Sequence, residues 1–439
     1  PRRRGLPGGR NGDGLADARS LRRRWEPVAI GAITVVLPIT FLISSIGMAI
    51  GVGGASIISR AFGQNDNRKA CATFGNQVGL TLFLAILFVA IGRYYQAPLL
   101  ALFGGKGDIA QPASIYFEIL LLGVPFLAWA MMSNNVIRAL GHPKMAMFTL
   151  IVPAIVNLVL DPIMIVVLDM GIAGAAWATT LSYTASAIYT TWFFLKKQHQ
   201  IVLNKSALLP NLSILKEMTA LGSVTLARQG TISVLSIILN NTLFTTGGEL
   251  ALSTYGIINR AMMVVNFPVL GITQGFVPIL GFNYGAELFE RVQKLVKLSI
   301  KSATLIAMGI FALIMLFTNP LVRIFTTETA LIEATVPALR IAFLATPLIA
   351  MNLIGSAYYQ AIGKAKPALL LALTKQGFFL IPLLLTLPLV WGIYGIWAAF
   401  PIADVGAALI TYWYLQKGLQ KIEEGQVVVV QQKSDKVEA

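Results

Sequence analysis

Runs of about 20 apolar residues, the length of helix that crosses a bilayer, follow one another along most of the chain. Eleven such runs predict membrane-spanning helices, at 31–59, 74–95, 110–135, 145–167, 172–195, 214–245, 251–281, 294–318, 332–360, 367–389 and 392–416. Several are longer than a membrane is thick, so we expect these helices to tilt or to extend into water. The pattern predicts an all-α polytopic membrane protein.

The composition supports this class, since 56% of the residues are hydrophobic and 12% are charged, whereas soluble domains average about 25% charged. The net charge of +15 does not indicate nucleic-acid binding, because the basic residues concentrate in loops between alternate spans, at 60–69, 138–144, 196–216, 291–301, 364–366 and 417–421. Loops rich in lysine and arginine normally face the cytoplasm. We therefore expect a multi-pass protein of a bacterial-type cytoplasmic (inner) membrane, with a cytoplasmic C-terminus.

The residues that usually hold metals are scarce. The single cysteine, Cys71, excludes an internal disulfide and a cysteine metal cluster, and both histidines, His142 and His199, fall in predicted loops. A membrane-embedded enzyme should show paired acids or histidines at one leaflet and a sizeable soluble loop. The sequence has neither, so we expect no enzyme activity, no cofactor and no bound transition metal.

The most informative stretch is Ile151–Thr180, where Asn157 and Asp161 interrupt an apolar run and share one helix face. An ionised carboxylate in hydrocarbon costs roughly 2.5–3.5 kcal/mol on insertion scales, so it normally faces a protein interior or a wet cavity. Pro153 and Pro162 bracket the pair, and proline kinks a helix. A bent helix with Asn and Asp on one face is typical of a cation or proton site. An aspartate that snorkels near a helix end is the alternative.

The two halves of the chain repeat each other at a nearly fixed offset. The offset in numbering is 222 for Gly53 with Gly275, Pro98 with Pro320, Phe103 with Phe325, Pro125 with Pro347 and Gly141 with Gly363, and it is 221 for Gly171 with Gly392 and Gly174 with Gly395. Internal repeats of this kind are a signature of secondary transporters, whose sites lie at or between the repeats. A duplicated scaffold without a transport role is the alternative.

The repeat also divides the chain. We expect an N-terminal lobe of five spans at 29–200, a cytoplasmic linker at 201–213, a C-terminal lobe of six spans at 214–418 and a cytoplasmic tail at 419–439. The repeat-related equivalent of the span 214–245 in the first half would lie 222 positions earlier, at about −8 to 23. Instead of an apolar span, residues 1–28 carry eight arginines. We expect residues 1–28 to be an atypical, disordered Arg/Gly-rich tail and the first transmembrane helix to be absent.

Several segments resemble the multidrug and toxic compound extrusion (MATE) family. They are GVGGASIISRAFGQND (51–66), NNVIRALGHP (134–143), NLVLDPIMI (157–165), GIAGAAWAT (171–179) and GITQGFVPILGFNYGA (271–286), and the similarity covers about 29–416. The resemblance implies two pseudo-symmetric six-helix bundles, here five plus six, forming a V around a central cavity. It also implies antiport of organic, often cationic, compounds against H⁺ or Na⁺.

The same resemblance assigns a coupling site. The chain resembles the DinF-like branch of the family and is also similar to MepA-like drug exporters. DinF-like members use an aspartate on helix 1, an Asn and Asp four residues apart on helix 5, and a Thr on helix 6. Asn157, Asp161 and Thr179 match the last three, whereas the helix-1 aspartate has no counterpart. The resemblance therefore implies that Asp161, Asn157 and Thr179 bind the coupling ion, H⁺ or Na⁺.

Other polar and soft side chains inside the spans are candidates for a substrate cavity. We expect the cavity to be lined by Met131, Asn134, Gln229, Arg260 and Met263. Plain helix packing is the favoured alternative for the methionines, and interhelical hydrogen bonding is the alternative for Asn134. We expect helix kinks at Pro125, Pro153, Pro162 and Pro347. Lys375 and Asp404 are predicted to form a structural ion pair between adjacent helices.

The prediction is thus a cation-coupled multidrug efflux transporter that acts as a monomer on small organic cations within the bilayer. Two alternatives stay open. A lipid-linked oligosaccharide flippase of the same superfamily would favour a strongly cationic cavity. An inactive, truncated exporter would keep the scaffold without its activity.

Overall fold

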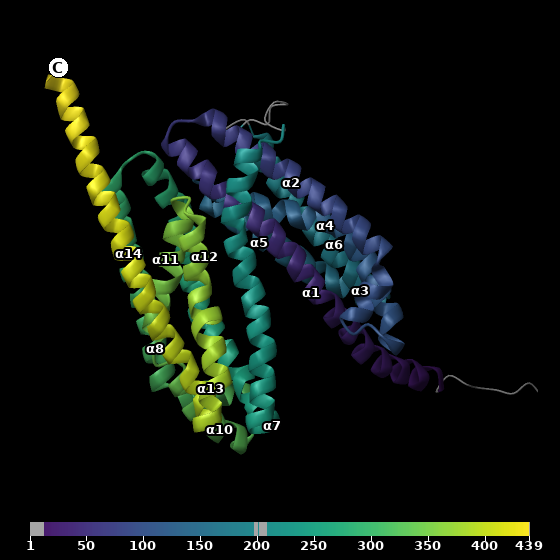
Figure 1. Ribbon diagram of the computed structural model, residues 1–439. Coiled ribbons are helices and arrows are strands. Elements are labelled where there is room, and N and C mark those ends of the chain that lie inside the picture. Colours follow the sequence, from purple (N-terminus) through teal and green to yellow (C-terminus); the bar gives the residue numbers. More distant parts are fainter. Residues whose placement is uncertain (1–12, 197–200, 202–208, 439) are drawn as a thin grey trace, which may run out of the picture. The chain divides into compact units, whose positions relative to one another are not determined.

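The computed structural model describes residues 13–196, 201 and 209–438, and it describes side chains between residues 28 and 422 of these ranges. In this part of the chain the secondary structure is helical and includes no strand (Figure 1). The all-α polytopic fold that the apolar runs predict is confirmed.

The first half consists of six α-helices and two short helical turns of other types. The α-helices are α1 (Asp13–Gly63), α2 (Asn67–Tyr94), α3 (Gln96–Leu102), α4 (Ala110–Ala139), α5 (Pro143–Pro162) and α6 (Gly171–Leu195). A 3₁₀ turn, η1 (Gly107–Ile109), precedes α4, and a π-helical turn, η2 (Ile163–Val167), continues α5.

The second half begins with a very long helix that contains a kink. Its elements are α7 (Leu212–Gly285), α8 (Phe289–Leu316), α9 (Thr318–Phe325), α10 (Thr329–Ala342), the 3₁₀ turn η4 (Thr346–Leu348), α11 (Ile349–Ala361), α12 (Ala365–Leu373), the π-helical η5 (Thr374–Leu380), α13 (Ile381–Trp391) and α14 (Ile393–Glu438). Within α7, Gly248 has a φ of 65°, which breaks the helix between the predicted spans 214–245 and 251–281.

The predicted spans agree with the helices. Within the described residues, eight helices are long and apolar enough to cross a membrane, or nine when α10 and α11, bent by 44°, count as one span. The long helix α7 holds two of the eleven predicted spans, and α6 covers the predicted span 172–195 although many of its residues are Ser, Thr or Tyr. The protein is therefore a multi-pass membrane protein.

The expectation of disorder at 1–28 is wrong for residues 13–28, because α1 begins at Asp13. This segment is rich in leucine, alanine and arginine, which are good helix formers, and it extends a helix that already has a nucleus. Residues 1–12 lie outside the described residues, as do 202–208 of the predicted linker. The predicted tail 419–439 continues α14 as helix to Glu438.

The chain divides into two compact units whose boundaries differ from the predicted lobes. Unit 1 comprises 1–47, 80–131 and 147–197, and unit 2 comprises 48–79, 132–146 and 198–439. One end of each of α1, α2, α4 and α5 therefore belongs with the second half. One physical reason is a set of very close backbone contacts, described below, between the end of α1 and α7.

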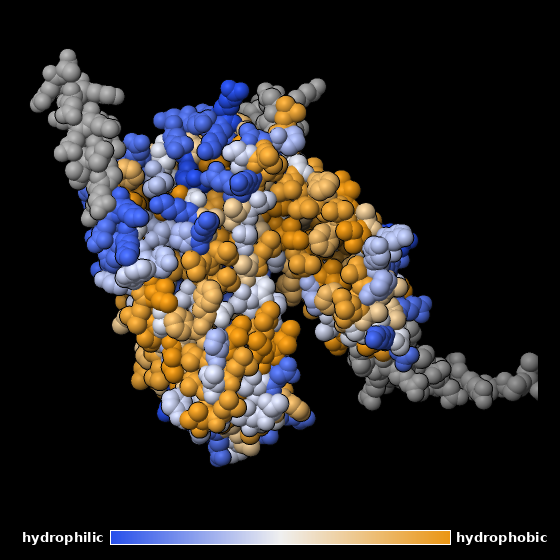
Figure 2. All heavy atoms as spheres, viewed as in Figure 1, coloured by the Kyte–Doolittle hydropathy of each residue, from blue (hydrophilic) through white to orange (hydrophobic). Residues whose placement is uncertain are grey.

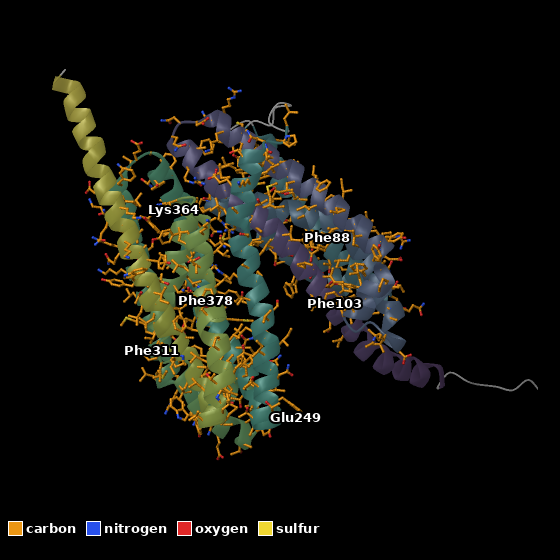
Figure 3. All side chains as sticks on the ribbon, viewed as in Figure 1. Phe88, Phe103, Glu249, Phe311, Lys364 and Phe378 are labelled. Atoms are coloured by element: carbon orange, nitrogen blue, oxygen red, sulfur yellow. The ribbon has the colours of Figure 1, made fainter. Side chains whose placement is uncertain are left out.

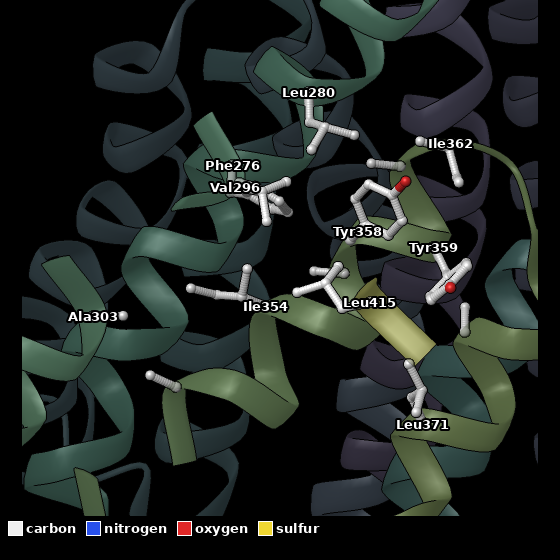
Figure 4. Packing of buried hydrophobic residues seen from close by; sticks show 14 of the residues in the cluster. Phe276, Leu280, Val296, Ala303, Ile354, Tyr358, Tyr359, Ile362, Leu371 and Leu415 are labelled. Atoms are coloured by element: carbon white, nitrogen blue, oxygen red, sulfur yellow. The ribbon is translucent and has the colours of Figure 1, made fainter. Parts of the chain in front are cut away.

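Each unit has its own apolar core. In unit 1 the core gathers buried residues of α1, α4 and α6, such as Val36, Phe117 and Ala176. In unit 2 one core cluster joins α7, α8, α11 and α14, and it includes Phe276, Ile354 and Leu415 (Figure 4). A second cluster in unit 2 surrounds Trp397, on α14.

The surface of unit 2 is typical of a membrane protein. Figure 2 shows a broad hydrophobic face, and hydrophilic residues gather at the end that carries the α11–α12 turn. Lys364 marks this end and Glu249 marks the opposite one (Figure 3). Between them α8 exposes Leu298, Leu305 and Leu313, each more than half exposed, as lipid would require.

The repeat seen in the sequence is also present in the backbone. Residues with positive φ recur at the repeat offsets, as Asn65 (56°) and Glu287 (57°), Gly141 and Gly363 (both 82°), and Gly171 (54°) and Gly392 (56°). The short helices α3 and α9 begin at repeat-related positions, Gln96 and Thr318. The two halves therefore share the conformations of their turns.

Within unit 2 the ends of α1 and α7 cross at two repeat-related glycines. A Cβ on Gly63 would lie 2.1 Å from the backbone oxygen of Phe282, and a Cβ on Gly285 would lie 2.2 Å from that of Arg60. The two glycines are related by the repeat offset, and so are the two carbonyls, so the contact is reciprocal. Only residues without a side chain allow this approach, which ties the end of α1 to the second half.

Candidate functional site

The candidate site in unit 1 begins with the irregular end of α5. Pro153 and Pro162 lie inside this helix, and Pro162 is followed by the π-helical turn η2. Proline removes a backbone donor from the ladder, and π-turns inside helices frequently mark functional positions. Asp161 therefore lies next to a proline where the helix changes its geometry.

A tight turn then brings α6 back against α5. Asp169 and Gly171 both have positive φ, of 50° and 54°, and the Met170 amide donates to the Met164 carbonyl over 3.1 Å. A Cβ on Gly174 would lie 2.6 Å from the same Met164 carbonyl. The absence of a side chain at Gly174 lets α6 pack closely on η2.

Asn157 and Asp161 contact each other as their spacing predicts. The Asn157 amide donates from Nδ2 to Oδ1 of Asp161 over 3.3 Å. Both side chains are half-buried. No basic side chain within the described residues forms an ion pair with Asp161. The carboxylate is therefore oriented by an amide but has no counter-charge there.

A tyrosine from α4 completes the cluster. Tyr116 is buried, with 7% of its surface exposed; it shares a hydrogen bond with the Thr179 side chain and is near enough to Asp161 to interact with its charge. The Thr179 hydroxyl also donates to the Ala175 carbonyl over 2.9 Å. Sequence reasoning missed Tyr116, because a tyrosine in an apolar helix, far from Asp161 along the chain, carries no local signal.

The cluster offers only oxygen ligands: the Asp161 carboxylate, the Asn157 amide oxygen and the hydroxyls of Thr179 and Tyr116. Such groups suit a proton or a hard cation. Within the described residues, no group of three or more His, Cys, Asp and Glu side chains could hold a metal ion. The cluster therefore combines one formal negative charge, on Asp161, with neutral oxygen groups.

The five predicted cavity residues are divided between the two units, with Met131 in unit 1 and the other four in unit 2. Met131, in unit 1, is half-buried and packs against the core of that unit. In unit 2, Met263 is 47% exposed, Gln229 is exposed, and the Arg260 guanidinium lies over the Phe325 ring, 5.7 Å from its centroid.

Asn134 has structural contacts at the junction of α4 and α5. It is 4% exposed, donates from Nδ2 to the Ala146 carbonyl over 2.7 Å, and accepts a hydrogen bond from Arg138 at its Oδ1. These contacts match the interhelical hydrogen bonding that is the alternative interpretation of this residue.

The predicted kink positions lie in different surroundings. Pro125 lies inside the continuous helix α4, and Pro153 and Pro162 lie inside α5. Pro347 lies in η4, between α10 and α11, where the path bends by 44°. The bend between two helices is therefore at Pro347, and the π-helical turn follows Pro162.

The predicted ion pair in the second half is confirmed. Lys375 Nζ lies 2.5 Å from Asp404 Oδ1, and Asp404 is 5% exposed. Lys375 belongs to the π-helical η5 and Asp404 to α14. In unit 2 the buried Asp404 is therefore neutralised by Lys375, whereas Asp161 in unit 1 has no ion-pair partner among the described residues.

Comparison with known proteins agrees with this geometry. Residues 17–163 and 224–386 match the sequence model of the MatE family. The chain belongs to the MatE family. The multidrug export protein MepA of Staphylococcus aureus (strain NCTC 8325 / PS 47) is 26% identical over 390 residues, which cover 87% of this chain and 85% of MepA. The MepA of Staphylococcus saprophyticus is 26% identical over 392 residues, with the same coverage.

Solved structures of MatE proteins have the same fold. A crystal structure of MATE in complex with MaD3S superposes with a TM-score of 0.85 at 25% identity and covers 91% of this chain and 89% of that one. An outward-facing multidrug resistance MATE family transporter of the MOP superfamily gives 0.85 at 24% identity and covers the same shares, 91% and 89%. The MATE fold expected from the sequence motifs is therefore confirmed.

Proposed function

We propose that this MatE protein is a multidrug exporter that exchanges lipophilic, often cationic, organic compounds for H⁺ or Na⁺. The relatives named as multidrug export proteins support the efflux reaction. The chain would act as a monomer in a bacterial-type cytoplasmic membrane, with its C-terminus in the cytoplasm, and would need no cofactor beyond the coupling ion.

The observation that carries the coupling proposal is the Asp161 cluster. A half-buried carboxylate inside an apolar helix receives an amide hydrogen bond from Asn157 and lies near Tyr116, whose hydroxyl is hydrogen-bonded to Thr179. Since an unneutralised carboxylate in hydrocarbon is costly, a proton or sodium ion bound here would be stabilising. The pair Lys375–Asp404 cannot serve in this way while the lysine neutralises the acid.

The mechanism we propose is reciprocal binding. A coupling ion neutralises Asp161 in one state of the transporter, and a cationic substrate is favoured in the other state, when the carboxylate is bare. Because linkage is mutual, each ligand weakens binding of the other by the same factor. The proline-bearing end of α5 and its π-turn are the elements whose geometry would respond to neutralisation of Asp161.

Gradient-driven efflux from vesicles tests this proposal. The full chain is reconstituted into liposomes loaded with ethidium, a fluorescent lipophilic cation, and either a pH gradient or a sodium gradient is imposed. We expect one gradient to accelerate ethidium transport, and the effective gradient identifies the coupling ion.

The matched variants are Asp161→Asn and Glu118→Gln, which each remove one carboxylate from unit 1. Glu118 is about half exposed and forms its ion pair with Arg93, so its loss should leave transport unchanged, whereas Asp161→Asn should abolish the gradient effect. Transport that no gradient accelerates, or acceleration that survives Asp161→Asn, would refute the coupling role.

A further inference from the structure

A cavity of about 580 Å³ in unit 2 lies apart from the Asp161 cluster. It is bounded by the end of α1, the turn between α4 and α5, and α7. Its polar wall includes Asn65, Arg138, His142 and Asn283, and no acidic side chain is among the described residues that line it. By the distribution of lysine and arginine, this end of the helices faces the cytoplasm.

Arg138 is the charged group of this cavity, and its charge is not balanced by a carboxylate. Its Nη1 donates to Oε1 of Gln274 and its Nη2 donates to Oδ1 of Asn134. Both acceptors are neutral amides, and within the described residues Arg138 makes no ion pair. A guanidinium has five N–H donors, so three remain for a ligand after these two bonds.

The amide acceptors also fix the direction of the guanidinium. Asn134 is itself held by its bond to the Ala146 carbonyl, so the Arg138 side chain is tied to both α5 and α7 before any ligand arrives. A planar, pre-oriented guanidinium is the side chain best suited to bidentate recognition of an oxyanion.

The repeat provides an internal comparison for this place in the fold. The repeat-related equivalent of Phe282 in the first half is Arg60, whose Nη1 would lie 2.4 Å from a Cβ on Gly363. Gly363 is in turn the equivalent of Gly141, which lines the cavity together with Phe282. The space that is open beside Gly141 is therefore occupied beside Gly363 by the Arg60 side chain, which pairs with Glu217 over 2.7 Å.

The equivalent of Arg138 itself is neutral. It is Gln360, which is 6% exposed and donates to the Leu221 carbonyl over 3.0 Å. At the turn that contains Gly363, the positive charge of Arg60 is thus balanced within the protein by Glu217. At the turn that contains Gly141, the volume is open and Arg138 has no acidic partner among the described residues. A bound anion would balance the charge of Arg138.

We propose that this cavity binds a phosphate group, with the Arg138 guanidinium as its principal donor. Tetrahedral phosphate matches the paired N–H groups of arginine, and basic pockets between transmembrane helices on the cytoplasmic side are suited to phosphate-bearing headgroups. The other wall is apolar and accessible, since Ile279 is 53% exposed and Phe282 is 46% exposed. The phosphate can therefore belong to a lipid headgroup or to a small soluble phosphate.

Binding to the purified full chain in detergent tests the site and distinguishes the two sources. In one arm, inorganic phosphate is titrated into the protein at constant ionic strength, with chloride as the control anion. In the other arm, the short-chain lipid dihexanoyl phosphatidylglycerol is titrated. Both arms are measured by isothermal titration calorimetry. We expect saturable binding in at least one arm, and the arm that saturates identifies the source.

Variants assign the binding to Arg138. Arg138→Gln should raise the Kd for phosphate about 10- to 100-fold, the usual effect of losing a charge-assisted hydrogen bond. Lys144→Gln, an exposed position close by that removes the same charge but does not line the cavity, should leave the Kd unchanged.

A second variant covers the case in which Arg138→Gln does not fold. Ile279→Trp, at a half-exposed lining position, fills the volume but keeps the guanidinium, and it should also abolish saturable binding. Absence of saturable binding of both probes to the natural chain would overturn the proposal. Equal affinity in Arg138→Gln or in Ile279→Trp would overturn it too.

Discussion

Asp161 lies one helical turn after Asn157, and its carboxylate accepts a hydrogen bond from the Asn157 amide and lies near Tyr116. At this scale the sequence predicts the contact between Asn157 and Asp161 directly, because residues four apart share a helix face. Thr179 could be found only through a family resemblance, since nothing in its own surroundings marks it. Tyr116 could not be found, because its role depends on how α4 packs against α6.

The Tyr116 hydroxyl provides a prediction at the residue scale. Tyr116→Phe removes its hydrogen bond to Thr179 and keeps the ring, so we expect the affinity for the coupling ion to fall about 10-fold, which corresponds to ~1.4 kcal/mol. The measurement is the ion concentration that gives half-maximal stimulation of ethidium transport in vesicles.

A tyrosine elsewhere in unit 1 gives the matched control. Tyr94 is 80% exposed, so Tyr94→Phe should leave the half-maximal ion concentration unchanged. If both variants behave alike, Tyr116 has no part in ion binding, and the cluster reduces to Asn157, Asp161 and Thr179.

At the scale of elements, helices are the most predictable feature and their ends the least. Nearly all residues of the predicted apolar runs are helical, because lipid requires every backbone group to be bonded within its own helix. The short helices α3 and α9 and the π-turns η2 and η5 have no hydropathy signal, so sequence reasoning missed them. It also missed the start of α1, because charge composition masked good helix propensity in residues 13–28.

The crossing of α1 and α7 explains why the units differ from the predicted lobes, and it gives a stability prediction. Gly63→Ala would put a Cβ 2.1 Å from the Phe282 carbonyl oxygen, and since backbone cannot yield easily, we expect a loss of about 1–3 kcal/mol. Thermal unfolding of the purified protein in detergent should show a lower Tm.

Gly271→Ala in α7 is the control, because a Cβ there would have no neighbour within 4 Å. This change should be neutral or slightly stabilising, as alanine has the better helix propensity. A Tm for Gly63→Ala equal to that of the natural chain would mean that the two helices separate at this point without cost.

At the scale of the whole molecule, duplication explains why the two halves share the same turns. Divergence of the two halves explains why their acidic side chains have different surroundings. The halves keep the same positive-φ positions at Asn65 and Glu287 and at Gly141 and Gly363. In the described part of unit 1, Asp161 is an acid without a basic partner, whereas in unit 2 Asp404 is neutralised by Lys375. The sequence predicts this asymmetry, since Phe379 and Leu383 are the repeat-related equivalents of Asn157 and Asp161.

The central claim is that one carboxylate, Asp161, binds the coupling ion in competition with a cationic substrate. The most direct measurement is the ethidium Kd of the purified full chain as a function of pH and of sodium concentration. Neutralising Asp161 removes the charge that attracts the substrate, so the Kd should rise as the pH falls or as sodium increases, and Asp161→Asn should abolish this dependence while Glu118→Gln retains it. An ethidium Kd that depends on pH or sodium to the same extent in Asp161→Asn would contradict the account.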